Sequence, residues 1–278
     1  MRLALLLGLL AGLVSGQKRN IFDLIPPDAR MVYGSHVARY EQSVLHNFYP
    51  NGLDGFYGGQ EWRQHVRQMI ITECMRGGLT IVTGEVGPLF AGEQPEEGRP
   101  GYTVLGPGTA IIGDADSLNE AAARWQREDL SGIAVKAERL AATYDNWFIA
   151  VRPLAERDRL SDRAPGPRLK YMDDMAGLVE EVRGGLCVGR RSEFHLEVDM
   201  KTTEDAQTLA ALGRWLPGFV QSKNPHGRAA LIAEYAENIS ITPSGNTVTL
   251  SFTLEEGKLE EVLRREEELP AQHEGFVE

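Results

Sequence analysis

Hydrophobic and polar residues alternate most regularly over residues 194–201. The hydrophobic positions are Phe194, Leu196, Val198 and Met200, and the polar positions between them are His195, Glu197, Asp199 and Lys201. A period of two residues is typical of a β-strand that has one face in the core and the other in water. We therefore expect a half-solvated antiparallel strand in this segment.

The same kind of pattern, interrupted by glycine or proline turns, predicts four β-hairpins. The paired segments are residues 66–75 with 79–86, 102–105 with 109–113, 186–189 with 194–200, and 239–241 with 248–254. In the last hairpin, the residues expected to face water are Thr247, Thr249, Ser251 and Thr253. Two further strands are expected at residues 29–37 and 147–151.

Segments with the spacing of amphipathic helices lie between these strands. Helices are expected over residues 38–48, 117–126, 133–142, 172–183, 203–216, 229–235 and 259–268. Ser117 and Glu120 have the spacing of a capping box, and Thr203 is expected to cap the helix that it begins. The glycine pair at 184–185 is expected to end the helix before it, and the Pro-Gly pair at 217–218 to interrupt another.

These elements predict an α+β protein built mainly on antiparallel sheet. Residues 102–126 and 239–265 both follow the order strand, turn, strand and helix, and a further hairpin precedes each. The repeat indicates two related ββα-containing halves, with chance similarity of two common α+β units as the alternative. The expected division is residues 17–154 and 171–268 as the two halves, 155–170 as a linker or long loop, and 269–278 as an acidic tail.

The first sixteen residues have the composition of a secretory signal peptide. Arg2 gives a positive start, residues 3–14 are apolar, and small residues lead to a cleavage point after Gly16. The apolar run is shorter than the roughly 20 residues of a spanning helix, so an N-terminal membrane anchor is the weaker alternative. No later apolar run has the length of a span. We expect an exported chain in the periplasm or outside the cell, without a membrane span after cleavage.

Charge narrows the classes of partner. The chain has 29 Lys and Arg residues against 40 Asp and Glu residues, a net charge of −11. Binding to nucleic acid or to an anionic lipid surface relies on basic residues, so this balance argues against both. Only six of the basic residues are lysines, which indicates the coding bias of a GC-rich genome. Together with the signal peptide, this bias favours a bacterial exported protein.

The two cysteines, Cys74 and Cys187, fall in apolar segments that resemble strands. A disulfide between them is permitted outside the cytosol. The alternative is a pair of buried free thiols that behave as small hydrophobic side chains. We favour the free thiols, because nothing in the sequence brings the two segments together.

No short motif of catalysis, metal binding or phosphate binding is found in the chain. It has no G-x-S-x-G elbow, and neither cysteine has a neighbouring histidine in sequence. The six histidines form no H-E-x-x-H, H-x-H or Cys/His knuckle. Residues 106–113 (GPGTAIIG) lack both the P-loop lysine and the dinucleotide-binding spacing. We therefore expect neither a cofactor nor a metal.

One glycine-rich segment, residues 48–62, combines aromatic and polar side chains in the manner of a ligand site. Phe56, Tyr57 and Trp62 are interleaved with glycines and lie near Asp54 in sequence. Aromatic faces beside carboxylates hold apolar ligands and stack on sugars. The alternative is a loop that one or two aromatic side chains attach to the core. The candidate ligand-binding residues are Asp54, Phe56, Tyr57 and Trp62.

The order of several longer motifs resembles a group of uncharacterised exported bacterial proteins. The motifs are IPPDARMVYG (25–34), LTIVTGEV (79–86), AIIGDADSLNEAAARW (110–125), TEDAQTLAAL (203–212) and ISITPSGNTVTL (239–250). They span most of the mature chain. The resemblance implies an exported protein and carries no activity or catalytic residue with it.

The sequence thus favours a non-enzymatic exported protein that binds an unknown envelope protein or a small ligand. The alternative is an envelope hydrolase whose site is assembled from residues that are distant in sequence. A deep pocket that gathers titratable residues such as His36, His46, Asp54 and Glu61 would favour the enzyme. A shallow polar surface would favour the binding protein.

Overall fold

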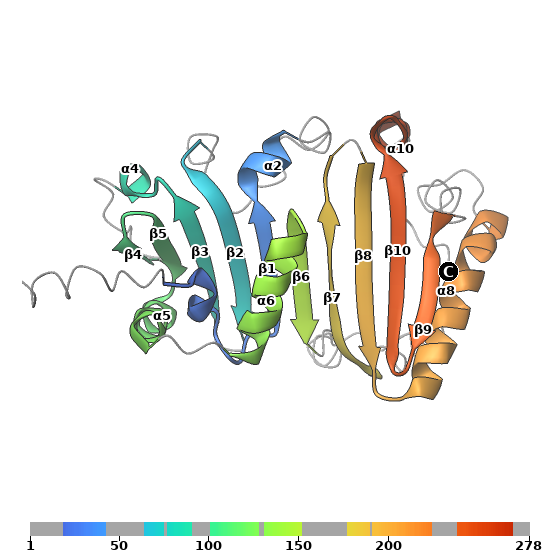
Figure 1. Ribbon diagram of the computed structural model, residues 1–278, viewed down its shortest axis with the longest axis horizontal. Helices are drawn as coiled ribbons and strands as arrows, with labels where there is room; N and C mark the ends of the chain where they lie inside the picture. The colour runs from blue at the N-terminus through green and yellow to red at the C-terminus, as the bar shows by residue number, and fades with distance from the viewer. Residues whose placement is uncertain are drawn as a thin grey trace, which may run out of the picture.

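Ten strands form one continuous antiparallel sheet in the computed structural model of the chain (Figure 1). The structure describes residues 19–42, 64–74, 77–90, 101–127, 131–151, 177–189, 191–223 and 238–268. The strands are β1 (Met31–His36), β2 (Val66–Cys74), β3 (Gly77–Gly84), β4 (Gly101–Gly106), β5 (Thr109–Gly113), β6 (Asn146–Val151), β7 (Val179–Cys187), β8 (Arg191–Met200), β9 (Ser240–Ser244) and β10 (Thr247–Glu255). The predicted α+β class with antiparallel sheet is confirmed, and each of the four predicted hairpins is a pair of neighbouring strands.

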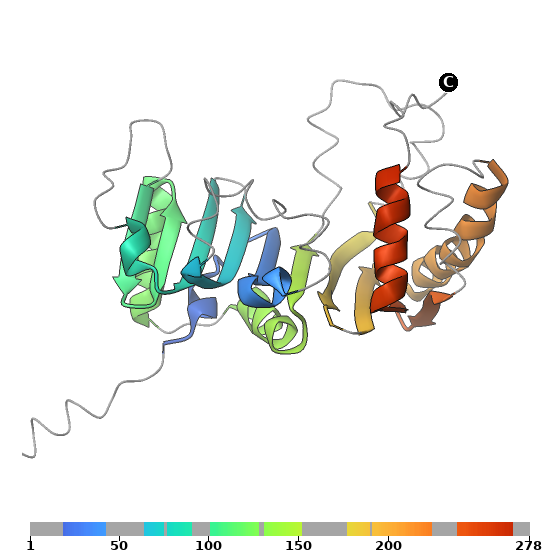
Figure 2. The ribbon, with the colours of Figure 1, turned by 90° about the horizontal axis from the view of Figure 1, so that it is seen from above.

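Helices lie on both sides of this sheet. They are η1 (Ile21–Leu24, a 3-10 helix), α2 (Val37–Glu41), α4 (Gly87–Phe90), α5 (Ala115–Arg127), α6 (Gly132–Thr143), α8 (Thr203–Lys223) and α10 (Glu256–Glu268). In Figure 2, α6 lies on one side of the sheet, whereas α8 and α10 extend on the other. Within the described residues, no helix is long and apolar enough to cross a membrane.

The strand order is symmetrical about the central pair of strands. The order is β4-β5-β3-β2-β1-β6-β7-β8-β10-β9, so the first five strands and the last five run outward from the centre in the same sequence. In each set a helix follows the third strand (α4 or α8) and another follows the fifth (α5 or α10). The two sets of five strands therefore share one topology, but they do not coincide with the predicted halves, because β6 lies within the predicted N-terminal half of residues 17–154. The second set begins at β6, ahead of the expected linker at 155–170, which lies outside the described residues.

Three strands of the first set, β2, β3 and β5, have buried residues on both faces. On one face, Ile70, Ile81 and Ile111 pack beneath η1, α5 and α6. On the other face, Met69 and Val82 belong to a second cluster with residues of α2 and α4. Two buried faces require hydrophobic residues at consecutive strand positions, which explains the apolar run that forms β3.

In the last set, β6 adds Trp147 and Ile149 to the first cluster, whereas β7, β8 and β10 contribute to a hydrophobic cluster on the opposite face. Val198 and Val248 pair across β8 and β10 and join Ala206 and Ala210 of α8 in a third hydrophobic cluster. The next register pair, Glu197 with Thr249, points to the opposite face. The alternation predicted over residues 194–201 is therefore confirmed, and it separates an apolar face under α8 from a polar one.

The prediction of a helix over residues 172–183 is wrong for residues 179–183, which belong to strand β7. The glycine pair that was expected to end this helix lies inside the strand instead. A Cβ on Gly184 would lie 2.1 Å from the carbonyl oxygen of His195, and one on Gly185 would lie 2.3 Å from Cγ of Tyr144. Both glycines are needed for close packing within the sheet, not for a helix C-cap.

Two predicted helix caps are displaced along the chain. Asp114, not Ser117, caps α5, since its Oδ1 accepts a hydrogen bond of 2.8 Å from the Ser117 amide. Thr202, not Thr203, caps α8 through a hydrogen bond from the Asp205 amide. The Pro-Gly pair at 217–218 does not end α8, which continues to Lys223. The expected helix over 229–235, the signal peptide and the acidic tail lie outside the described residues.

Among the residues that the structure describes, Trp147 has the largest fully buried side chain, and it packs against a glycine of the neighbouring strand. Trp147 is 1% exposed, and a Cβ built on its register partner Gly34 would lie 2.2 Å from the indole ring. Phe22 of η1 contacts the same ring, with centroids 6.3 Å apart. The close approach of β1 and β6 at this point therefore requires a residue without a side chain at position 34.

We predict that Gly34→Ala destabilises the protein by about 2–3 kcal/mol, because the new methyl group must displace the buried indole. Gly132→Ala is the matched control, since a Cβ there meets nothing within 4 Å and alanine favours a helix. Urea unfolding followed by circular dichroism measures both changes. Equal stability of the two variants would contradict the assigned packing.

Candidate functional site

The four ligand-binding residues predicted from sequence, Asp54, Phe56, Tyr57 and Trp62, lie outside the described residues. Their role as a ligand site stays a prediction. Of the titratable residues expected to mark an enzyme pocket, only His36 is described. Its ring Nε2 donates a hydrogen bond of 3.2 Å to the carbonyl oxygen of Ala141, so it ties β1 to α6.

The two cysteines are both free thiols in the structure and form no disulfide with each other. Cys74 lies on β2 and Cys187 on β7, with β1 and β6 between them. Three strand spacings of about 4.8 Å separate these strands by ~14 Å, beyond the reach of a disulfide. Because β2 and β7 run in opposite directions, their C-terminal cysteines also lie at opposite ends of the sheet.

The face of β7, β8 and β10 opposite α8 forms the strongest candidate surface, which we call the polar face. Its residues are Glu181, Arg183, Cys187, Glu193, His195, Glu197, Asp199, Thr247, Thr249, Ser251 and Thr253. The Glu181 side chain, which contacts α6, is 11% exposed, and along β8 the exposure rises from 23% at Asp199 to 32% at Glu197 and 60% at Glu193. The polar face therefore has a sheltered part around Glu181 and an open part at the Glu193 end of β8.

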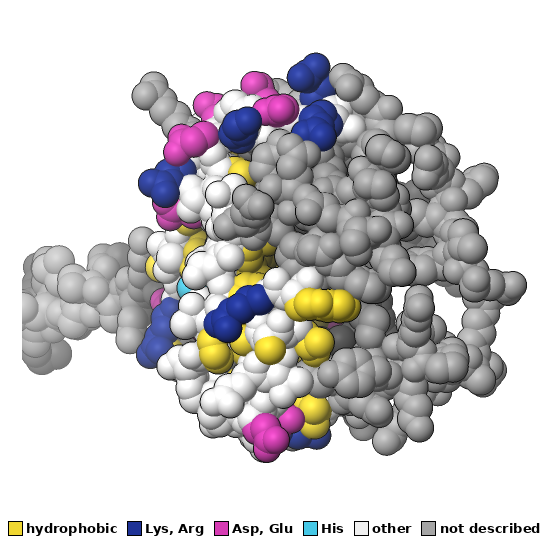
Figure 3. Space-filling view, turned by 90° about the vertical axis from the view of Figure 1, so that its right-hand side faces the viewer, with side chains coloured by type: hydrophobic (Ala, Val, Ile, Leu, Met, Phe, Trp, Pro, Cys, Tyr) yellow, Lys and Arg dark blue, Asp and Glu magenta, His cyan; other side chains and the backbone are white. Residues whose placement is uncertain are grey.

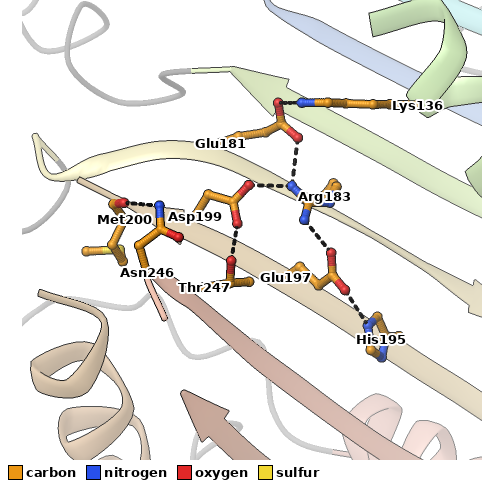
Figure 4. Close-up of polar contacts among 9 residues, drawn as sticks. All are labelled: Lys136, Glu181, Arg183, His195, Glu197, Asp199, Met200, Asn246 and Thr247. Atoms are coloured by element: carbon orange, nitrogen blue, oxygen red, sulfur yellow. Dashed lines mark hydrogen bonds and ion pairs between the residues drawn. The ribbon is translucent and has the colours of Figure 1, made fainter. Parts of the chain in front are cut away.

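Arg183 organises the sheltered part by contacting three carboxylates (Figure 4). Its Nη1 donates hydrogen bonds of 2.9 Å to Glu181 and 2.5 Å to Asp199, and its Nη2 lies 2.6 Å from Glu197. Lys136 of α6 reaches Glu181 at 2.5 Å. We call these five residues the Arg183 cluster; it joins α6 to β7 and β8 through charge-assisted contacts.

Electrostatics within the Arg183 cluster favour the charged forms of its members. Burial alone lowers the pKa of Arg183, but its hydrogen bonds to Asp199 and Glu181 outweigh burial and raise that pKa. Burial raises the pKa of Asp199, but hydrogen bonds from Thr247 and Arg183 outweigh it and lower that pKa. The guanidinium and the Asp199 carboxylate therefore stabilise each other.

The β9–β10 hairpin is fixed to this cluster by its turn. Thr247 Oγ1 donates a hydrogen bond of 2.6 Å to Asp199, and Asn246 Nδ2 donates one of 3.1 Å to the carbonyl oxygen of Met200 (Figure 4). Gly245 has a φ of +59°, the left-handed conformation that a two-residue turn requires. The Arg183 cluster thus links three strands and α6 into one polar unit.

An aromatic contact continues the polar face toward the end of β7. The rings of Tyr144 and His195 are stacked with centroids 6.3 Å apart, and His195 Nε2 lies 3.3 Å from Glu197. Burial raises the pKa of Tyr144. Next to this pair, the buried carboxylate of Asp145 accepts hydrogen bonds from Arg39 and from the Val188 amide. These contacts hold the end of the sheet together.

The chemistry of the polar face is that of a surface whose charges are already paired. Cys187 donates a hydrogen bond to the Thr143 carbonyl, and burial raises the pKa of its thiol, which disfavours the nucleophilic thiolate. Within the described part of the chain, no group of three His, Cys, Asp or Glu side chains could hold a metal ion.

A second surface lies at the α8 and β9 end of the sheet, where hydrophobic side chains gather beside basic ones (Figure 3). Trp215 of α8 is 58% exposed. Arg214 donates hydrogen bonds of 3.2 and 2.7 Å to the carbonyl oxygen of Ile241, and Pro243 has no amide hydrogen to offer. These two residues protect β9 from pairing with a further strand.

The sequence predicted part of the polar face but not Arg183 at its centre. The period over 194–201 placed His195, Glu197 and Asp199 on a wet strand face, as observed. Arg183 was assigned to a helix, so its contact with these carboxylates was not foreseen. The signal that could have revealed this strand is the segment 179–187, because its two glycines are as compatible with the middle of a strand as with the end of a helix.

Comparisons with known proteins show the fold alone. No protein-family model and no curated protein matches the chain. The structure is similar to TP0453 in crystal form IV, with a TM-score of 0.53 and 10% identity over 87% of this chain and 95% of that one. It is also similar to crystal form III of TP0453, with a TM-score of 0.51 and 9% identity over 87% and 96% of the two chains.

We predict that Arg183→Met destabilises the protein by about 2 kcal/mol, because three partly buried carboxylates lose their shared cation. Arg191→Met is the matched control: its side chain is 61% exposed and its ion pairs are 3.8 and 3.9 Å long. The control should change stability by less than about 0.5 kcal/mol. Chemical denaturation at neutral pH measures both, and similar losses would show that the cluster contributes nothing specific.

We predict a pH-dependent loss for Asp199→Asn. The folded protein lowers the pKa of Asp199, so its carboxylate contributes stability above its unfolded pKa of about 3.9, and this is lost as pH falls toward the folded value. The variant should be less stable by about 1–2 kcal/mol at pH 7, and the deficit should shrink below about pH 4. Urea unfolding across this range tests it, with the exposed Glu193→Gln as control. A deficit independent of pH would contradict the electrostatic origin.

Proposed function

We propose that this chain is an exported, non-enzymatic protein of the cell envelope that acts by binding a partner through the polar face. The observation that carries the proposal is a solvent-facing strand surface whose central charges are paired internally by Arg183. A partner that covers this surface does not have to compensate a buried unpaired charge, which is the costly part of covering ions. The signal peptide predicted from the sequence supports export.

The charge of the polar face suggests the chemistry of the partner. Its carboxylates outnumber its cations, and the hydroxyl groups of Thr249, Ser251 and Thr253 alternate along β10. Hydroxyl side chains offer both donors and acceptors at modest desolvation cost. A polar or basic protein surface fits this arrangement better than an acidic one. The hydrolase remains the alternative function, without a described residue that favours it.

The proposal is tested with the tagged mature chain, residues 17–278, incubated with envelope extract and cross-linked. We predict that Ser251→Arg, which places a large cation opposite His195 in the register, abolishes capture of the partner seen with the unmodified chain. Gln207→Arg, exposed on α8, makes the same charge change on the other side and should leave capture intact. Equal capture by both variants would reject the polar face as the binding surface.

Export has a separate test, the mass of the chain recovered from the source cells. We expect an N-terminus at Gln17 in the envelope or secreted fraction. Recovery of the uncleaved chain in the cytosol would overturn the export part of the proposal and leave the binding test unaffected.

A further inference from the structure

His195 lies in the middle of the polar face, where Gly185 of β7 and Ser251 of β10 are its register partners. Its ring is stacked on the ring of Tyr144, and Tyr144 is itself held close above Gly185, where a Cβ would lie 2.3 Å from the Tyr144 Cγ. The side chain of His195 remains 34% exposed. Water therefore reaches an imidazole whose position is fixed by its neighbours.

Glu197 connects His195 to the Arg183 cluster (Figure 4). Its Oε2 lies 2.6 Å from Nη2 of Arg183, and its Oε1 lies 3.3 Å from Nε2 of His195. Because a carboxylate accepts hydrogen bonds at both oxygens, Glu197 can hold the guanidinium and an imidazolium at the same time. Protonation of His195 therefore adds a positive charge to the polar face without requiring a contact of the cluster to break.

The ionisable groups nearest to His195 come from the three segments packed around it. In the described chain they are Tyr144, Arg183, Cys187, Glu193 and Glu197. Burial raises the pKa of the Tyr144 hydroxyl and of the Cys187 thiol, so both are neutral at neutral pH. On the other side, β10 presents the hydroxyl groups of Thr249, Ser251 and Thr253. The local charge is therefore set by Arg183 and the carboxylates.

More distant charges around His195 largely cancel. They form the ion pairs Lys136 with Glu181, Arg191 with Glu255, and Arg39 with Asp145. What is left is one cation, Arg183, against the carboxylates of Glu193, Glu197 and Asp199, a net charge of −2. With a neutral imidazole, the polar face is thus negative around His195 and attracts a basic partner.

Protonation of the imidazole halves this negative charge. Histidine is the side chain that ordinarily gains its charge as pH falls from about 8 to about 5, a range in which Asp and Glu side chains ordinarily stay ionised. In that range the net charge around His195 changes from −2 to −1. The attraction for a positively charged partner falls with it.

We propose that protonation of His195 weakens the binding of a basic partner to the polar face, so that the face binds at neutral pH and releases at mildly acidic pH. The inference rests on the proposed function and adds a regulation of the same surface.

Octalysine is the probe, titrated at low salt into the mature chain at about pH 7.5 and about pH 5.5 and followed by ¹H–¹⁵N NMR. At the higher pH we expect saturable shifts at the amides of Glu193, Ser251 and Thr253. At the lower pH the Kd should be about threefold weaker, as expected for one added surface charge in a medium close to water. His195→Gln keeps a polar side chain that does not titrate, and it should bind octalysine equally at both pH values.

A matched control moves the imidazole to another place on the chain. His195→Gln combined with Gln207→His has the original number of histidines, with the new one exposed on α8, on the other side of the sheet. This double variant should also bind equally at both pH values. Unfolding midpoints measured at each pH establish that the variants are folded.

The outcomes separate the regulation from the proposed function. Equal Kd values of the unmodified chain at the two pH values, or the same pH dependence in either variant, would overturn the role of His195 and leave the polar face as a binding surface. If octalysine gives no saturable shift on the polar face at either pH, the basic partner of the proposed function fails together with its regulation.

Discussion

The pairing of β1 with β6 is the contact on which the rest of the structure depends. Each set of five strands would otherwise end in an exposed edge at this point, open to pairing with another chain. The seam is closed by the indole of Trp147 over Gly34 and by Asn146, whose side-chain oxygen accepts hydrogen bonds from Tyr33 and Ser35. Because Ser35 is fully buried, these hydrogen bonds also satisfy polar groups that water cannot reach.

The shared strand order does not give the two halves the same surface. Strands β2, β3 and β5 of the first set have buried residues on both faces, whereas β7, β8 and β10 of the last set leave one face to water. The transition occurs between β6 and β7, where Ile149 packs in the core and its register partner Arg183 carries the ion network. Lys136 belongs to α6, which packs on the buried Trp147 and Ile149 of β6. Its contact with Glu181 of β7 therefore joins this buried region to the polar face.

The sequence predicted those elements whose pattern depends on local neighbours. Alternation in β8 and the turn at Gly245 are local features, and both were found. The Arg183 cluster depends on which strands become neighbours, and a single sequence does not contain that information in a visible form. Gly184 and Gly185 show the difficulty, since close packing against His195 and Tyr144 and a helix C-cap both select glycine. The segment 48–62 was selected from composition, and its contacts lie outside the described residues.

The way in which the polar face satisfies its charges decides what kind of partner could cover it. On the polar face, Arg183 gives its donors to three carboxylates of the same chain, so recognition there depends on shape and on the hydroxyl groups of β10. An internally paired surface can be covered by a large partner at low electrostatic cost, because none of its ions loses its counter-charge when water is excluded.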